Sequence, residues 1–173
     1  MNCILKWRRI MKIREYPDPV LRIESEEVTR YDKSLKNIIR QMINAMKFKE
    51  GIGLAANQIG ITERIMVLDF NGKPMELINP EITGKSKEKE FQFESCLSCP
   101  DFSASMKRFI GIDVEFINVS GNKKKMHLEG IFARVFQHEL DHLNGILIID
   151  YAPNRERFNY NLYITKENKY DRD

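Results

Sequence analysis

The sequence predicts an α+β domain in which mostly antiparallel strands surround a central helix. Three features predict this fold class. Residues 33–48 carry the apolar period of an amphipathic helix, and a second apolar helix is bounded by Gly130 and Gly145. Between the helices lie β-branched segments separated by turn sequences, of which Asn71-Gly72 is the strongest hairpin signal. We therefore expect hairpin-linked strands around the second helix, with the first helix packed on the outside.

Composition places the chain among globular domains with a core of their own. It has 173 residues, of which 42% are hydrophobic and 31% charged, and this length suits a single domain. The net charge of +3 is too small to indicate nucleic-acid binding, although a mildly basic surface suits contact with a polyanion such as a ribosome. No apolar run approaches the roughly 20 residues that a membrane helix needs. We therefore expect neither a membrane nor a specific nucleic acid as a partner.

The cysteine content indicates a reducing compartment, and the first residues do not indicate secretion. The three cysteines are an odd and small number, which argues against a secreted scaffold built on disulfides. Residues 1–10 contain three basic residues but lack the length and order of a secretory signal. We treat them as a peripheral extension of a single domain at residues 11–173. A cytoplasmic protein, bacterial or phage-encoded, fits this segment, and an organellar origin is the alternative.

The helix at residues 33–48 is predicted from the spacing of its apolar residues. They recur at intervals of three and four, which places them on one face. This apolar stripe consists of Leu35, Ile38, Ile39, Met42, Ile43 and Met46. Asp32 precedes it in the position of an N-cap. Residues 51–60 then end the helix, and their glycines and alanines allow two backbones to approach closely.

Strands are predicted on both sides of the turn at residues 71–72. Residues 64–70 are β-branched and apolar, residues 74–78 return, and Asn79-Pro80 is expected to end the returning strand. This arrangement is an antiparallel hairpin.

Further strands are predicted later in the chain. Residues 112–119 and 123–128 form a second pair, with His127 as an exposed strand residue. Residues 146–151 are apolar and are expected to form a buried strand after the second helix. The tail after Pro153 is polar and aromatic, and it has no period that predicts an element.

The second helix carries the strongest chemical signal, a His-Glu-x-x-His pattern at residues 138–142. His138 and His142 are four residues apart, so both imidazoles leave one face of a helix and can converge on a metal ion. Glu139 follows the first histidine, where a carboxylate can take a proton from water that the metal activates.

The opposite side of this helix is apolar. Its residues are Ile131, Val135, Leu140 and Leu143. They favour a buried helix over the alternative, a surface helix that happens to carry two histidines. Two of the three histidines of the chain lie here, and a third candidate ligand, Cys96, occurs upstream.

Cys96 and Cys99 form a Cys-x-x-Cys pattern, which has three interpretations: a redox pair, a structural zinc site, or a catalytic metal site that uses Cys96 alone. A redox pair usually needs a strand-to-helix context, which Pro100 and Asp101 do not supply. A structural zinc site would use both cysteines and both histidines, but it would be closed and would leave Glu139 without a role. With Cys96 alone, one thiolate and two imidazoles leave an open position for water, as a catalytic metal requires.

Three segments together resemble the motifs of the peptide deformylase family. They are residues 51–58 (Gly-Ile-Gly-Leu-Ala-Ala-Asn-Gln), residues 94–98 (Glu-Ser-Cys-Leu-Ser) and residues 137–142 (Gln-His-Glu-Leu-Asp-His). Their order and distances also resemble the family, and the likeness runs from Met11 to Tyr151. Each motif is modestly specific, whereas all three in register are strongly so.

Two residues depart from the commonest family pattern. Ser95 stands where glycine is common, and we interpret it as the marker of a subgroup. Cys99 stands where an aliphatic residue is common. We expect Cys99 to be a packed thiol that does not bind metal. Competition for the metal, or oxidation together with Cys96, is the alternative.

The resemblance implies hydrolysis of the N-formyl group from the initiator methionine of nascent polypeptides, with release of formate. It also implies one divalent metal ion, Fe²⁺ in the cell, which Zn²⁺, Ni²⁺ or Co²⁺ can replace. Cys96, His138 and His142 would be the ligands, and Glu139 would move the proton. The partners would be N-formylmethionyl peptides, nascent chains and the ribosome surface.

The resemblance further implies how the substrate is held. The side-chain amide of Gln58 and the backbone N–H of Leu97 would donate hydrogen bonds to the oxyanion. The backbone of Ile52, Gly53 and Leu54 would pair with the extended substrate as an added strand.

Two other functions stay open on the sequence alone. A zinc endopeptidase would use the His-Glu-x-x-His pattern with a different third ligand, so it would keep its metal after mutation of Cys96. A non-catalytic, deformylase-like binding module would recognise a chain terminus or the ribosome, and coordination by both cysteines and both histidines would favour it.

We also expect Glu94 to pair with Arg108 and brace the loop of Cys96, the alternative being two unrelated surface charges.

Overall fold

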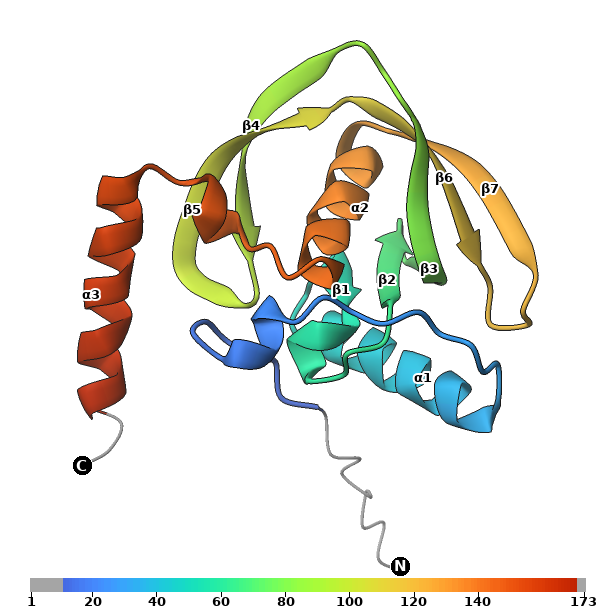
Figure 1. Cartoon of the computed structure of the whole chain (residues 1–173), viewed down its shortest axis with the longest axis horizontal. Helices are drawn as coiled ribbons and strands as arrows, with labels where there is room; N and C mark the ends of the chain where they lie inside the picture. Colours follow the sequence, from blue (N-terminus) through green and yellow to red (C-terminus); the bar gives the residue numbers. More distant parts are fainter. Residues whose placement is uncertain (1–10, 171–173) are drawn as a thin grey trace, which may run out of the picture.

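The computed structural model describes residues 11–170 and confirms the α+β fold class. Helix α2 (Gly130–Leu143) lies at the centre, strands arch around it, and helix α1 (Lys33–Phe48) lies beneath (Figure 1). A third helix, α3 (Asn154–Tyr170), stands at one side of the molecule. The predicted peripheral segment, residues 1–10, lies outside the described residues. Within residues 11–170, no helix is long and apolar enough to span a membrane.

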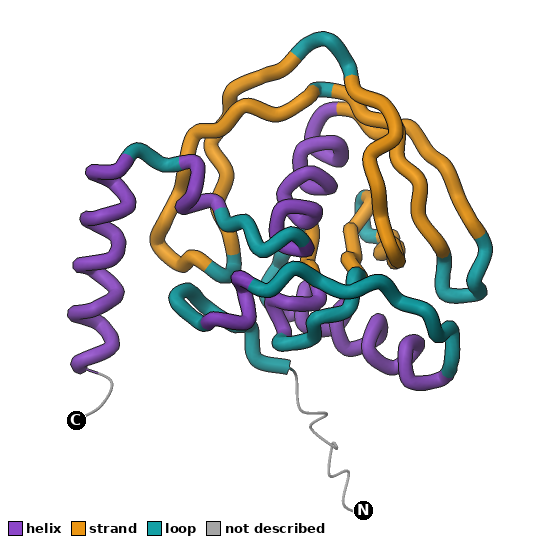
Figure 2. The backbone as a smooth tube through the Cα atoms, in the orientation of Figure 1, coloured by secondary structure: helices purple, strands orange, loops and turns teal. Residues whose placement is uncertain are grey.

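The strands pair antiparallel, as expected, and Figure 2 shows how they enclose α2. They form two sheets, and the strands of the smaller sheet, which carries Cys96, were not predicted from the sequence. The five-stranded sheet has the order β1-β2-β3-β6-β7, and the two-stranded sheet consists of β4 and β5. Their bounds are β1 (Gly53–Ala55), β2 (Ile65–Phe70), β3 (Lys73–Lys85), β4 (Lys89–Cys96), β5 (Cys99–Phe109), β6 (Gly111–Ile117) and β7 (Lys123–Glu129). Among the described strands, β1 pairs only with β2 and β4 only with β5, so each keeps one free edge.

Helix α1 and the first hairpin form as predicted, for local reasons. The Asp32 carboxylate accepts hydrogen bonds from the N–H groups of Ser34 at 2.8 Å and Leu35 at 3.1 Å, as an N-cap does. The apolar stripe of α1 packs against β1 and β2. Asn71 and Gly72 have φ values of 55° and 85° and join β2 to β3 as a two-residue turn.

The prediction that Asn79-Pro80 ends the returning strand is wrong, because β3 continues beyond these residues. A β-bulge absorbs them, since the register with β6 shifts between Ile78 and Glu81. The Asn79 side chain accepts a hydrogen bond from the Val28 N–H at 2.8 Å and donates one to the Val28 carbonyl at 2.9 Å. A proline without an N–H is tolerated at such an irregularity.

The buried strand predicted at residues 146–151 is instead a 3₁₀-helix, η3 (Ile148–Tyr151). Its two isoleucines are buried as expected. However, the Asp150 carboxylate accepts a hydrogen bond from the Leu147 N–H at 2.9 Å and so closes a helical turn. A short apolar run fits a buried strand or a buried helical turn equally well, and the period alone does not separate them.

Helix α3 is not visible in the sequence pattern because it has no apolar stripe. Among its side chains described up to residue 166, only Tyr160 is buried. Tyr160 is buried and donates from its hydroxyl to the Pro100 carbonyl at 2.9 Å, whereas Phe158 and Leu162 are exposed. Isolated anchors of this kind leave no helical period in the sequence.

The glycine after α2 is required by its surroundings. Gly145 has a φ of 72°, and a Cβ atom there would lie 2.7 Å from the carbonyl oxygen of Arg22. Within α2, Val135 and Leu143 are buried as expected, but Val135 lines the same cleft as His138, so its predicted place on the side opposite the histidines is wrong. Ile131 is 52% exposed, so its predicted place on the buried side is wrong. It lies in the first turn of α2, at the edge of the cleft described below.

Candidate metal centre

Helix α2 and the end of β4 bring one thiol and two imidazoles together. The ligand atoms of Cys96, His138 and His142 all lie within 4.8 Å of one another. The Cys96 Sγ atom is 3.0 Å from the His142 Nε2 atom, and the centroids of the two imidazole rings are 5.0 Å apart. None of the three residues is more than 8% exposed. The three candidate ligands therefore converge on one buried point.

A tight hairpin positions the cysteine. Strand β4 ends at Cys96 and β5 begins at Cys99, with Leu97 and Ser98 as the turn between them. The Ser98 N–H donates to the Cys96 Sγ at 3.3 Å. A hydrogen bond from the Cys99 thiol and the nearby His142 hold the pKa of the Cys96 thiol well below its usual value, although burial opposes this. The thiolate, which is the form that binds metals, is therefore favoured.

The donor set fits a divalent metal ion. One thiolate and two imidazoles suit zinc and ferrous iron alike, and three protein ligands leave a coordination position open. Cys99 does not belong to the converging group, and its side chain is fully buried in an apolar cluster. The structure therefore gives no support to a closed site with four protein ligands.

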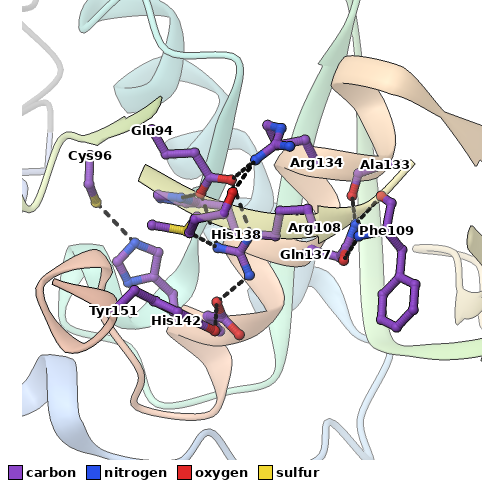
Figure 3. Close-up of polar contacts among 12 residues, drawn as sticks. Glu94, Cys96, Arg108, Phe109, Ala133, Arg134, Gln137, His138, His142 and Tyr151 are labelled. Carbon is purple, nitrogen blue, oxygen red and sulfur yellow. Dashed lines mark hydrogen bonds and ion pairs between the residues drawn. The ribbon is translucent and has the colours of Figure 1, made fainter. Parts of the chain in front are cut away.

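The carboxylate of Glu94 contacts the ring of His138 from the side of β4 (Figure 3). The Glu94 Oε2 atom lies 2.9 Å from the His138 Nδ1 atom. Contacts of this kind fix the orientation and basicity of histidines in metal sites. Burial lowers the pKa of His138, but its hydrogen bonds with Cys96 and Glu94 outweigh burial and raise that pKa well above its usual value.

Two arginines hold Glu94 in turn. Arg108 donates from Nε and Nη2 to the two carboxylate oxygens, at 3.0 Å each, and Arg134 donates to Oε1 at 2.8 Å. Burial alone would raise the pKa of Glu94, but hydrogen bonds from His138 and Arg108 lower it to about 2. The predicted Glu94–Arg108 pair is confirmed, and it is buried. The sequence pattern does not indicate a role for Arg134, although this residue lies four residues before His138 and so on the same face of α2.

The network continues to the C-terminal end of α2. Arg108 donates to Asp141, and the Tyr151 hydroxyl donates to the same carboxylate at 2.8 Å. The Arg108 guanidinium lies 5.2 Å from the centroid of the Tyr151 ring. Burial and the charge of Asp141 raise the pKa of Tyr151 to about 12, so its hydroxyl keeps its proton and stays a donor. Strands β4 and β5, helix α2 and the turn η3 are thus tied together beside His138.

Glu139 lies against the backbone of β1. A Cβ atom at Gly53 would be 2.5 Å from the Glu139 Oε1 and 2.6 Å from the Val135 Cγ1, so only glycine fits between β1 and α2 here. Glu139 is 4% exposed, and its Oε2 has no hydrogen-bond partner among the described residues. Burial raises the pKa of its carboxyl group. A buried carboxylate with an unpartnered oxygen and a raised pKa is suited to take up a proton.

The amide of Gln58 faces the cysteine. Gln58 belongs to the 3₁₀-helix η2 (Ala56–Ile59), and its Oε1 accepts a hydrogen bond from the Ala55 N–H at 2.8 Å. Its Nε2 is therefore turned toward the β4–β5 hairpin, where it lies 3.1 Å from the Ser98 Oγ and 3.7 Å from the Cys96 Sγ. The donor end of this amide therefore points toward the candidate ligand Cys96.

A cleft of about 510 Å³ opens beside these groups. The predicted site residues that line it are Ile52, Gly53, Gln58, Cys96, Leu97, His138 and Glu139. Leu54 does not line it, because its side chain is buried in the cluster that contains the apolar stripe of α1. His142 also does not line it and is 1% exposed. Arg134 and the exposed Ile131 line the cleft without having been expected there.

Comparison with known proteins decides between the functions that the sequence leaves open. The family model described as polypeptide deformylase matches residues 10–158. The chain belongs to this family. A peptide deformylase of Thermotoga neapolitana is 46% identical over 139 residues, which cover 80% of this chain and 85% of that protein.

Solved structures of the family share the fold. The peptide deformylase of Thermotoga maritima has a TM-score of 0.80 at 45% identity, and the match covers 83% of this chain and 99% of that one. The peptide deformylase of Ehrlichia chaffeensis has a TM-score of 0.88 at 31% identity, and the match covers 95% of this chain and 99% of that one. The protein is therefore a metal-dependent hydrolase that removes the N-formyl group of nascent polypeptides. The comparisons support neither the zinc endopeptidase nor the non-catalytic binding module.

Proposed function

We propose that Cys96, His138 and His142 bind one divalent metal ion, ferrous iron in the cell, and that Glu139 is the general base of deformylation. One observation carries this proposal. A thiol and two imidazoles converge within 4.8 Å, and a buried carboxylate with an unpartnered oxygen follows one of them in the helix. When bound, the metal supplies a Lewis acid that lowers the pKa of water toward ~7.

The protein's own groups move the proton and stabilise the charge. Glu139 takes a proton at Oε2 from the attacking water, whose oxygen adds to the formyl carbon. The Gln58 Nε2 and the Leu97 N–H donate to the formyl oxygen as it becomes negative, and one such donor contributes about 3 kcal/mol of transition-state stabilisation. When the C–N bond breaks, Glu139 returns the proton to the amine nitrogen of methionine and formate leaves.

The free edge of β1 is the proposed binding site for the substrate backbone. Ile52, Gly53 and Leu54 would pair with an extended chain through their backbone groups, as in strand addition. The position of Ile52 and Gly53 on the cleft supports this proposal, and the burial of the Leu54 side chain leaves its backbone available for the same role. The methionine side chain would lie beside the apolar residues Ile131 and Val135 of α2, which also line the cleft.

The native metal and the cellular setting complete the proposal. The donor set accepts Fe²⁺, Zn²⁺, Ni²⁺ or Co²⁺, and resemblance to the family is what favours Fe²⁺. An iron–thiolate site is also sensitive to oxygen, because the thiolate can be oxidised.

Residues 11–173 would act as one catalytic domain on nascent chains near the ribosome surface, in a bacterial cytoplasm or in the host of a phage. An organellar setting is the alternative.

Metal reconstitution tests the proposal. Anaerobically purified protein would be stripped with a chelator, reloaded separately with Fe²⁺, Ni²⁺, Co²⁺ or Zn²⁺, and assayed for formate release from a short formyl-methionyl peptide. We expect loss of activity after stripping, its return on reloading with iron, and loss of metal binding in Cys96→Ala. The absence of formate release from fully loaded protein would overturn the function. Full metal retention by Cys96→Ala would overturn the ligand assignment.

A further inference from the structure

Cys96 and Cys99 face each other across the hairpin that carries the metal centre. The register of β4 and β5 places them directly opposite, with only Leu97 and Ser98 between them in the chain. Opposed residues of an antiparallel pair have Cα atoms about 4.5–5.5 Å apart. Disulfides join cysteines whose Cα atoms are about 4.4–6.8 Å apart. The hairpin backbone therefore holds these two free cysteines within the range of a disulfide.

The two thiols differ in how an oxidant can reach them. Cys96 lines the cleft, so a small molecule that enters the cleft meets its sulfur. Cys99 has no exposed surface and lies in an apolar cluster with Leu21, Met106 and Leu147. Within the part of the chain that the structure describes, these are the only two cysteines. An oxidised Cys96 thus has one neighbouring thiol with which to react.

We propose that Cys96 and Cys99 form a reversible oxidation site for peroxides. The Cys96 thiolate attacks one oxygen of hydrogen peroxide, the O–O bond breaks, and hydroxide leaves, which gives a sulfenic acid on Cys96. The Cys99 sulfur then attacks the sulfenic sulfur. The S–S bond forms, the S–O bond breaks, and the hydroxyl group leaves with the Cys99 proton as water. The two sulfurs together lose two electrons, and the peroxide accepts them.

The disulfide removes one proposed metal ligand but stops oxidation at a reversible stage. A sulfenic acid without a neighbouring thiol proceeds to sulfinic and sulfonic acids, which reductants do not reverse. A dithiol reopens the disulfide by thiol exchange and restores the Cys96 thiol. This oxidation site is a property separate from deformylation. Disulfide formation changes the mass of the protein, so it can be measured without an activity assay.

Mass spectrometry of peroxide-treated protein tests the proposal. Anaerobically purified, metal-loaded protein would carry Cys3→Ser in every sample, so that only Cys96 and Cys99 supply thiols. After treatment with hydrogen peroxide, we expect the intact mass to fall by two hydrogen atoms, a peptide to link Cys96 to Cys99, and bound metal to be lost. Dithiothreitol followed by fresh metal should return both thiols and the metal content to the level of the untreated protein.

Cys99→Val is the matched variant, because valine fills a buried strand position without a sulfur atom. Cys99→Ala serves if valine impairs folding. In either variant we expect Cys96 to gain two or three oxygen atoms and dithiothreitol to restore no metal binding. The proposal is overturned if Cys96 gains the same oxygen atoms whether or not Cys99 is present. It is also overturned if peroxide treatment of the protein that keeps Cys99 yields no peptide linking Cys96 to Cys99.

Discussion

The His138 Nδ1 atom lies 2.9 Å from the Glu94 Oε2 atom, so a carboxylate on an outer strand contacts a ring on the central helix. The same carboxylate accepts hydrogen bonds from Arg108 and Arg134, and all four side chains are buried. The orientation of one proposed ligand therefore depends on residues from β4, β5 and α2 that lie far apart in the sequence.

Replacing Glu94 with glutamine should both destabilise the fold and weaken metal binding. Two buried arginines would lose their shared carboxylate, and breaking a buried ion pair in this way costs about 3–5 kcal/mol. Loss of the carboxylate partner of a ligating histidine lowers metal affinity about 10–100-fold. Urea unfolding of the metal-free protein and metal titration measure the two effects. Glu90→Gln is the matched control, because Glu90 is exposed on the same strand. Equal effects of the two substitutions would contradict the role given to Glu94.

Replacing Gly53 with alanine should separate β1 from α2. The new Cβ atom would lie 2.5 Å from the Glu139 Oε1 and 2.6 Å from the Val135 Cγ1. Overpacking of this kind lowers the free energy of unfolding by about 1–3 kcal/mol. A displacement of about 1 Å at a reacting group lowers kcat/KM about 100-fold.

Gly51→Ala is the control for this substitution. Its Cβ atom would meet the end of the flexible Leu97 side chain at 3.1 Å, and that side chain can move. We expect Gly51→Ala to retain most of the activity and stability, measured by peptide deformylation and urea unfolding. If Gly53→Ala were as active as Gly51→Ala, the close fit of Glu139 against β1 would not matter for catalysis.

His127 gives a pH test away from the metal centre. A hydrogen bond with Asp113, 2.7 Å from Nδ1, and a second with Glu129 raise the pKa of its imidazole. A raised folded-state pKa contributes stability that is full below the unfolded value of about 6.5 and is lost as pH rises through the folded value. An NMR titration of the His127 ring should show a pKa above about 6.5, which falls toward that value in Asp113→Asn. The same pKa in both proteins would contradict the assigned cause.

Local patterns explain which elements are predictable from the sequence. The N-cap of Asp32 acts within three residues, and the positive φ values of Asn71 and Gly72 serve a turn of two residues. Such signals lie within a few neighbouring residues, so the sequence alone predicts the elements that they form. The bulge at Asn79 is different, because its side chain bonds to the backbone of Val28, 51 residues earlier. Without that partner, an Asn-Pro pair predicts the end of a strand.

The site residues also divide into those that local spacing predicts and those that depend on partners far away in the sequence. The spacing of His138 and His142 follows from helical geometry, and the structure brings both beside Cys96. The place of Arg134 depends on Glu94, 40 residues before it, so its burial cannot be inferred from the period of α2 alone. Ile131 has the apolar character of a core residue, but only the position of the cleft explains why it is exposed.

The Glu139→Gln variant separates the role of Glu139 as general base from binding of the metal. Wild-type and variant proteins, purified anaerobically, would be assayed on the same formyl-methionyl peptide while their bound metal is quantified. We predict formate release by the wild type, and at least a ~100-fold lower kcat in a variant that keeps its metal, because glutamine cannot take the proton from water. A metal-loaded Glu139→Gln variant with wild-type kcat would show that Glu139 is not the general base.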